Sequence, residues 1–175
     1  MKSFILSIIF VKISGLKSSF SIYHLLIACN LLLFASCIKI EVFEKNVQIP
    51  NHEWKWENKP AINFDISDTI TAYNIFITLR HTEAYEYRNL WLFVYTKQPG
   101  DTVYQKARIE LPLQNAAGKW LSATGMDDIW EHRIKLFENI KFKKSGIYSI
   151  QLEQNMRDNP LKHVMNAGIR IEKVH

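Results

Sequence analysis

The sequence predicts an all-β protein: an antiparallel β-sandwich, immunoglobulin-like or jelly-roll-like, with seven to eight strands, preceded by an N-terminal signal peptide. Three observations predict this fold class. Apolar and polar residues alternate with a period of two in several short segments after residue 60. Clusters of turn-forming residues separate these segments. No segment there shows the apolar spacing of a long amphipathic helix.

The first 36 residues are predicted to be a removable lipoprotein signal peptide. They contain three lysines and no acidic residue, and residues 25–34 form an apolar run of the length typical of a signal-peptide core. The next residues resemble the lipobox of bacterial lipoproteins, in which small side chains flank the cleaved bond and a cysteine thiol receives diacylglycerol. The four residues concerned are Phe34, Ala35, Ser36 and Cys37. Cys37 is therefore the predicted lipidation site.

Two simpler readings of the leader stay open. It is also compatible with an ordinary secretory signal in which the cysteine is incidental. It is compatible with an uncleaved anchor as well, because residues 18–38 form a stretch of 21 residues without Asp, Glu, Lys or Arg, which is long enough to span a bilayer. An earlier apolar run, residues 4–13, is too short for that and suggests a start site placed too far upstream.

Charge and cysteine usage exclude several classes of function. The chain has 22 basic and 17 acidic residues. Without the three leader lysines the net charge falls from +5 to +2. That balance, with no basic stripe, argues against nucleic-acid binding. Cys29 and Cys37 are the two cysteines, so a chain beginning at Cys37 has neither an internal disulfide nor a cysteine metal site.

The expected organisation is a signal peptide (1–36), a lipidated N-terminus with the first strand (37–49) and a β-sandwich domain (50–175). Two or three acyl chains on Cys37 would hold the domain permanently on its membrane. No acidic cluster follows Cys37, unlike in some lipoproteins that are sent to the cell surface. We therefore expect a domain facing the periplasm, on the outer rather than the inner membrane.

Five sets of alternating apolar residues predict strands that have one buried and one solvated face. The sets are Ile62, Phe64 and Ile66; Ile75, Ile77 and Leu79; Val103, Ala107 and Ile109; Tyr148, Ile150 and Leu152; and Ile169 and Ile171. The strongest turn is the hairpin signal at residues 98–101, which reads Gln-Pro-Gly-Asp. A short helix is expected, if anywhere, in residues 126–138.

Four residues are candidates for structural roles. Gly146 and Tyr148 resemble a tyrosine corner, in which the tyrosine hydroxyl bonds to upstream backbone. Arg157 follows one predicted strand and Arg170 lies on another. Their guanidinium groups have the geometry to pin neighbouring segments through carboxylates or carbonyls. The alternative for both arginines is a solvated position.

Residues 90–96 are apolar on both faces, which predicts that both faces are covered. One face holds Trp91, Phe93 and Tyr95. The favoured interpretation is coverage by the chain itself, by the stretch that contains Trp54 and Trp56. The alternative is an exposed partner-binding patch.

No catalytic motif is present: the sequence has no phosphate-binding loop, nucleophile elbow or paired histidine metal motif. One acidic cluster with a histidine suggests either a cation site or a solvated loop or helix start, and we assign it no metal. It consists of Asp127, Asp128, Glu131 and His132. Trp54 and Trp56 would point the same way in an extended segment, which raises the possibility of stacking on sugar rings.

Several short pieces between about residue 42 and residue 172 match a known family in order and spacing. They begin with Val42-Phe43-Glu44-Lys45, Tyr73-Asn74-Ile75-Phe76-Ile77 and Gly118-Lys119-Trp120-Leu121, and they end with Gln154-Asn155-Met156-Arg157 and Gly168-Ile169-Arg170-Ile171-Glu172. With these pieces the chain resembles the gliding-motility lipoprotein family GldH of Bacteroidetes. One departure is the segment 122–125, which reads Ser-Ala-Thr-Gly where the family usually has a Gly-x-Gly turn.

The resemblance implies a non-enzymatic envelope component tied to gliding motility and to the type IX secretion machinery, without a cofactor and without a small-molecule substrate. Its partners would be the membrane, through the lipid on Cys37, and other envelope proteins of that machinery. The first hypothesis is therefore a lipid-tethered protein-interaction module that uses the face of Trp91, Phe93 and Tyr95. The alternative is a carbohydrate-binding envelope lipoprotein that uses Trp54 and Trp56.

Overall fold

The computed structural model describes residues 42–122, 124–126 and 128–174. The predicted signal peptide and Cys37 lie outside the described residues. Within them, no helix is long and apolar enough to cross a membrane. Their helical content is one short 3-10 turn, η2 (Pro50–His52). The described part is otherwise built from strands and loops.

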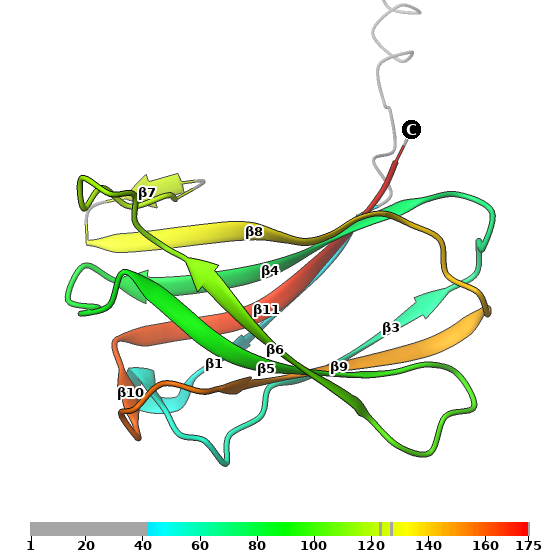
Figure 1. The fold of residues 1–175 in the computed structure, drawn as a ribbon, viewed down its shortest axis with the longest axis horizontal. Helices are drawn as coiled ribbons and strands as arrows, with labels where there is room; N and C mark the ends of the chain where they lie inside the picture. The colour runs from blue at the N-terminus through cyan, green and yellow to red at the C-terminus, as the bar shows by residue number, and fades with distance from the viewer. Residues whose placement is uncertain (1–41, 123, 127, 175) are drawn as a thin grey trace, which may run out of the picture. The chain divides into compact units, whose positions relative to one another are not determined.

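Two antiparallel sheets face each other as a sandwich (Figure 1). The five-stranded sheet has the order β1 (Val42–Gln48), β11 (Val164–Lys173), β4 (Tyr73–Thr82), β8 (Ile129–Ile140) and β7 (Thr124–Met126). The four-stranded sheet has the order β3 (Ala61–Ile66), β9 (Gly146–Gln154), β5 (Asn89–Lys97) and β6 (Gln105–Pro112). A small separate ladder joins β2 (Glu53–Trp54) to β10 (Leu161–Lys162). Eight of these strands have six or more residues, which confirms the predicted all-β sandwich.

The core lies between the sheets and is built from the alternating residues that the sequence pattern singles out. In β3 the burial pattern is strictly alternating, with Ile62, Phe64 and Ile66 inside. The inward residues of β4, β9 and β11 are equally buried, which confirms four of the five predicted alternating strands. Period-two alternation worked here because each of these strands has one sheet face against the opposite sheet.

The sandwich has two ends, which we name by where the chain enters it. The proximal end is the end at which β1 begins. There the register places Val42 opposite Glu172, and Ile66 opposite Gly146. The loops at this end are residues 67–72, 98–104 and 141–145. The distal end holds the loops 83–88, 113–121 and 155–160.

The expectation of a short helix in residues 126–138 is wrong. This segment contains the 12-residue strand β8, which pairs with β4 from Ile129 to Ile140. The side chains of His132, Ile134 and Leu136 face the core at a spacing of two. The backbone of β4 supplies hydrogen-bond partners along this segment, and that long-range pairing overrides its weak local helical preference.

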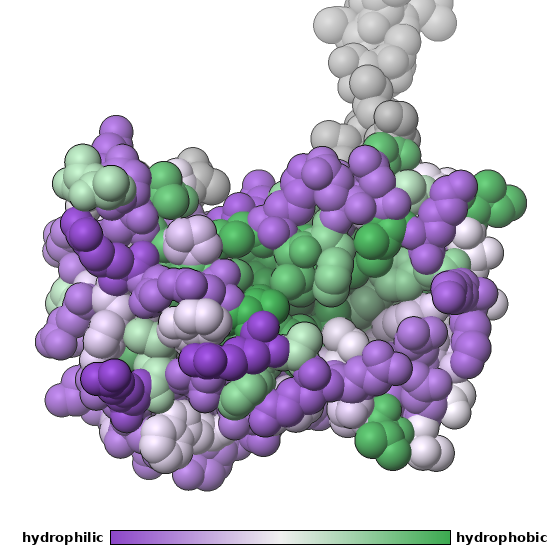
Figure 2. Space-filling model, viewed as in Figure 1, coloured by the Kyte–Doolittle hydropathy of each residue, from purple (hydrophilic) through white to green (hydrophobic). Residues whose placement is uncertain are grey.

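The predicted apolar face of residues 103–109 is wrong in its first half. Val103 lies in the loop before β6 and is 74% exposed, and Ala107 is exposed as well. Ile109 and Leu111 reach the core instead. The physical reason is that β6 is an edge strand, paired on one side only, and its first half is exposed on both faces. Figure 2 shows apolar side chains between the sheets on this side, where a cleft of about 240 Å³ opens beside Phe142.

Candidate functional site

The most distinctive surface is a row of three aromatic side chains on the outer face of the four-stranded sheet. Trp91, Phe93 and Tyr95 alternate along β5 with the buried residues of the same strand and are themselves half-buried. We call these three residues the aromatic row. Central strands keep their backbone fixed by ladders on both sides, here β6 and β9. The row is therefore a rigid platform.

Cationic side chains lie directly on this row. The Lys106 ammonium is 3.5 Å from the ring centroid of Phe93, and the Arg108 guanidinium carbon is 4.1 Å from that of Trp91. The register explains this contact, because β6 places Lys106 opposite Tyr95 and Arg108 opposite Phe93. Cations in this position are attracted by the ring quadrupoles. Neither forms a salt bridge with a carboxylate in the described part of the chain.

A carboxylate borders the row on its other side. Glu153 of β9 accepts a hydrogen bond from the Tyr95 hydroxyl and an ion pair from Lys59 at 2.8 Å. Burial opposes the charge on Glu153, but the hydrogen bonds from Lys59 and Tyr95 outweigh it and hold the pKa of Glu153 below its ordinary value. The Lys59 ammonium also lies 5.0 Å from the ring centroid of Tyr95. The row is thus flanked by fixed charges of both signs.

The favoured expectation, that the chain itself covers the row, is met in part, because the three rings are half-buried, but the stretch with Trp54 and Trp56 does not supply the cover. The row is partly covered by Lys59, Lys106 and Arg108 instead. Trp54 is fully buried in the core, where its indole N–H donates to the Asn58 carbonyl at 2.8 Å.

Trp56 is 42% exposed, because β2 ends at Trp54 and a turn follows. The two tryptophans therefore form no shared platform, since the turn breaks the alternation that would align them. The buried one is also not available as partner surface. The predicted sugar-binding pair loses its structural basis.

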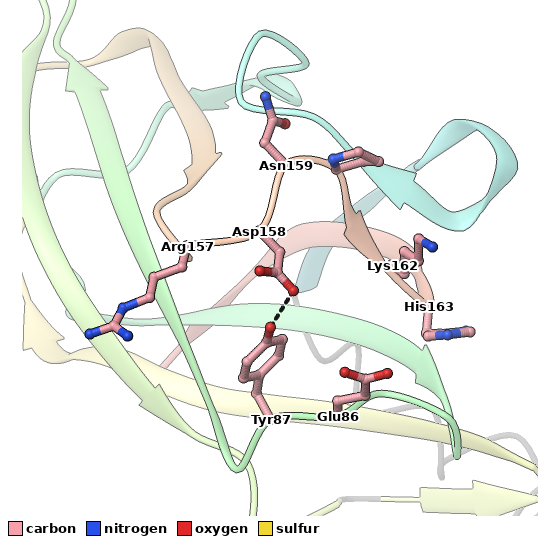
Figure 3. Close-up of a pocket in the computed structure, with 8 residues that line it drawn as sticks. Glu86, Tyr87, Arg157, Asp158, Asn159, Lys162 and His163 are labelled. Carbon is pink, nitrogen blue, oxygen red and sulfur yellow. Dashed lines mark hydrogen bonds between the residues drawn. The ribbon is translucent and has the colours of Figure 1, made fainter.

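A polar pocket of about 420 Å³ lies at the distal end (Figure 3). Loops 83–88 and 155–160, the end of β10 and His163 supply its lining. The lining residues are Glu86, Tyr87, Arg157, Asp158, Asn159, Pro160, Lys162 and His163. The Tyr87 hydroxyl donates a short hydrogen bond to the Asp158 carboxylate across this pocket. That bond raises the pKa of Tyr87.

The pocket adjoins the aromatic row. The Asn155 N–H donates to the Trp91 carbonyl at 2.8 Å, and the Trp91 N–H points at the Met156 sulfur at 3.3 Å. Arg157 comes directly after that contact, is exposed, and extends away from Asp158 in Figure 3. The loop that lines the pocket is thus bonded to the backbone of the row's first residue, and we treat the row and the pocket together as the candidate surface.

Arg170 and Tyr148 act within the fold. The Arg170 guanidinium donates to Glu44 of β1 at 2.7 Å and also to Glu172, so it ties the edge strand β1 to β11. The Tyr148 hydroxyl donates to the Lys144 carbonyl at 2.9 Å, which is tyrosine-corner geometry. Gly146 lies between them with φ of 120°, a conformation that favours glycine.

The acidic cluster does not assemble. Asp127 lies outside the described residues, Glu131 pairs with Arg80 on the outer face at 2.8 Å, and His132 faces the core. Successive strand residues point to opposite faces, which separates Glu131 from His132. Within the described residues, no group of three or more His, Cys, Asp or Glu side chains is arranged to hold a metal ion.

A buried histidine pair lies at the distal end, and no pattern in the sequence predicts it. The Nε2 atoms of His81 and His132 lie 2.8 Å apart, and both residues are fully buried. The Nδ1 of His81 lies 2.7 Å from the Thr82 carbonyl, and that of His132 lies 3.2 Å from the Leu121 carbonyl.

Burial lowers the pKa of His81 and, with the neighbouring ring, lowers that of His132 to about 4. The pair is therefore uncharged at neutral pH, with one N–H shared between the facing nitrogens. A carbonyl oxygen only accepts, so the 2.7 Å contact with Thr82 favours a proton on the Nδ1 of His81.

Comparison with known proteins identifies relatives along most of the chain. Residues 41–171 match the family model described as GldH lipoprotein. A gliding motility lipoprotein GldH homolog of Christiangramia forsetii is 31% identical over 165 residues, which cover 90% of this chain and 98% of that protein. The gliding motility lipoprotein GldH of Flavobacterium johnsoniae is 28% identical, over 85% of this chain and 94% of that protein.

Among solved structures, the VP2 subviral particle of infectious bursal disease virus aligns over 77% of this chain and 33% of that chain. The TM-score of 0.34 and the identity of 12% are too low to bear on fold or function.

Proposed function

Because the chain belongs to the GldH lipoprotein family, we propose that it is a lipid-anchored gliding-motility component of the cell envelope that binds another envelope protein. Acyl chains on Cys37 would hold it on the periplasmic side of the outer membrane. The β-sandwich would then serve as the interaction module, without a catalytic role, within the machinery shared by gliding and type IX secretion.

The aromatic row is the observation that carries the interaction role. Aromatic side chains and arginines are the residues that most often dominate binding energy at protein interfaces. Trp91 and Arg108 already stack on each other, so their geometry is set before a partner arrives. Lys106 and Arg108 leave N–H groups for acceptors on the partner. These features fit a partner that presents carboxylates or backbone carbonyls beside an apolar patch.

The proposal of a non-catalytic role is supported by where the titratable groups lie. His81 and His132 contact each other, and both side chains are buried. In the distal pocket, Asp158 is engaged by the Tyr87 hydroxyl. Neither arrangement offers a substrate an accessible nucleophile with an adjacent base.

Replacement of Trp91 and Tyr95 by serine in the full chain tests the interaction role. Envelopes are cross-linked in the cell, and the proteins captured with the variant and with the unaltered chain are compared by mass spectrometry. We expect a protein captured by the unaltered chain to be lost from the W91S/Y95S variant. Trp56→Ser removes an exposed tryptophan outside the row and is the control. We expect this variant still to capture the protein.

If both variants fold, remain in the membrane fraction and capture the same proteins, the aromatic row is not the binding surface. The link to secretion is tested in parallel. Loss of this chain is expected to reduce the proteins that the type IX machinery releases into the medium.

A further inference from the structure

The most exposed apolar side chains all lie at the proximal end of the sandwich. Ile70 is 82% exposed, Val103 is 74% exposed and Ile147 is 66% exposed. Every other large apolar residue in the described part of the chain is less than half exposed. Single exposed apolar residues are normal on a protein surface, but apolar residues gathered at one end of a domain are typical of a surface that binds a protein or a membrane.

These three residues lie in or next to three loops, two of which are joined by a hydrogen bond. Ile70 lies in the loop 67–72, Val103 in the loop 98–104, and Ile147 is the second residue of β9, after the loop 141–145. The Lys144 ammonium donates to the Pro99 carbonyl at 3.3 Å, which joins two of the loops. We call the loops 67–72, 98–104 and 141–145, together with Ile147, the proximal face.

The proximal face is also positively charged. Lys97, Lys141, Lys143 and Lys144 lie on it or at its edge. Its acids Asp68 and Asp101 are each within 4.0 Å of a lysine ammonium, from Lys173 and Lys144 respectively. Hydrogen bonds from Thr71 and Ile70, with the Lys173 contact, lower the pKa of Asp68.

Lys141 and Lys143 are exposed and form no salt bridge with any residue that the structure describes. The face therefore combines apolar tips with unneutralised ammonium groups.

The tether places this face near the membrane. β1 begins at Val42, and Phe43 packs on Phe64 beside the proximal loops with ring centroids 6.0 Å apart. Five residues lead from Cys37 to Val42, and a chain of that length spans at most about 17 Å. The 12-residue strand β8 alone has a length of about 40 Å, so the distal end lies beyond that reach.

We propose that the proximal face docks on the phospholipid surface that holds the acyl chains of Cys37. Ile70, Val103 and Ile147 enter the headgroup region, and Lys141 and Lys143 contact lipid phosphates. This inference rests on the proposed lipid anchor. Docking would fix the orientation of the domain and direct the distal pocket and the histidine pair away from the membrane. Apolar insertion and basic contacts add a second membrane signal to the acyl chains.

A photo-reactive amino acid placed at one position at a time in the full chain tests the proposal in cells. The test positions are Ile70, Val103 and Ile147. Trp56 and Leu121 are the matched controls, because both are exposed apolar residues at the distal end. After irradiation, phospholipid adducts on the purified protein are counted by mass spectrometry. We expect several-fold more phospholipid adducts at the three test positions than at the two controls.

The same samples separate failure of this proposal from failure of the lipid anchor. If Cys37 carries acyl chains while the test positions give no more phospholipid adducts than the controls, docking is wrong and the anchor stands. Cross-links from the test positions to a protein instead of phospholipid would also overturn docking. If Cys37 is not acylated, the anchor itself is wrong. Because the test side chains are exposed, their replacement leaves the core intact, which thermal unfolding verifies.

Discussion

Thr78 and Asn46 are joined by a hydrogen bond that passes over Gly168. The Thr78 hydroxyl on β4 donates to the Asn46 amide oxygen on β1 at 2.5 Å, although β11 lies between these strands. The register places Gly168 directly beside both residues. A residue without a side chain at this position leaves the space in which the two flanking side chains meet. This bond and the Arg170 contact with Glu44 hold the edge strand β1, the strand that follows the proposed membrane tether.

Gly168→Ala is expected to destabilise the fold. The added methyl group would lie 2.7 Å from the Thr78 hydroxyl and closer still to the Asn46 side chain and the Lys45 carbonyl. The Lys45 carbonyl belongs to the backbone, so it cannot rotate away from the added methyl group. Overpacking of this kind costs about 1–3 kcal/mol. Urea denaturation measures the loss. Thr78→Val, which removes the hydroxyl without adding volume at Gly168, should cost less, about 1 kcal/mol. An unchanged midpoint for G168A would contradict this view.

The two neighbouring tryptophans should differ sharply in their effect on stability. Trp54→Ala removes a fully buried indole and should lower the free energy of unfolding by about 3–5 kcal/mol. Trp56→Ala removes a half-exposed side chain and should change it by less than about 0.5 kcal/mol. Thermal unfolding of the two variants provides the comparison. Equal effects would mean that Trp54 is not part of the core.

Tyr148→Phe isolates the tyrosine corner. The change keeps the ring stacked on Phe64, with centroids 5.7 Å apart, but removes the bond to the Lys144 carbonyl. We expect a loss of about 1 kcal/mol, the typical net value of one hydrogen bond. Denaturant unfolding at neutral pH measures it. A variant as stable as the unaltered chain would show that the hydroxyl contributes nothing.

The buried histidine pair predicts acid sensitivity in a defined window. Burial lowers the pKa of His132 to about 4 and lowers that of His81, whereas an unfolded histidine has a pKa of about 6.5. The unfolded chain therefore binds more protons between these values. The free energy of unfolding should fall as pH falls from about 6.5 to about 4, by up to about 1.4 kcal/mol per pH unit for each histidine.

Denaturant midpoints measured between pH 7 and pH 4 test this dependence. His132→Gln removes one titrating group and should flatten the slope, whatever its effect at pH 7. Replacement of the half-buried His52, which lies outside the pair, by glutamine is the control and should leave the slope in place. A slope that is the same in H132Q and in the unaltered chain would contradict the assignment.

The strands that the sequence predicts correctly are those whose side chains face one apolar layer and one solvated layer. Ile62, Phe64 and Ile66 signal their strand because no other force competes with burial there. The pattern of residues 126–138 does not predict their strand. Their inward positions include the polar His132, and the strand is covered on its outer edge only by the short strand β7. Val103 does not fit the prediction because local alternation does not reveal where an edge strand begins, and Val103 lies in the loop before β6.

The candidate surface was only partly predictable. Trp91, Phe93 and Tyr95 share a face by spacing alone, but the cations over them depend on the register of β5 against β6. That register is set by a loop of seven residues, which a sequence pattern does not measure. The histidine pair joins residues 51 positions apart and was invisible for the same reason. Trp56 was misplaced because a turn after Trp54 breaks the alternation.

Intact-mass and peptide mass spectrometry of the protein purified from envelopes determine whether lipid on Cys37 holds this domain on its membrane. The result expected is a chain that begins at Cys37, with the thiol in thioether linkage to diacylglycerol and residues 1–36 absent. A chain that retains the leader, or whose Cys37 thiol is free, would contradict it.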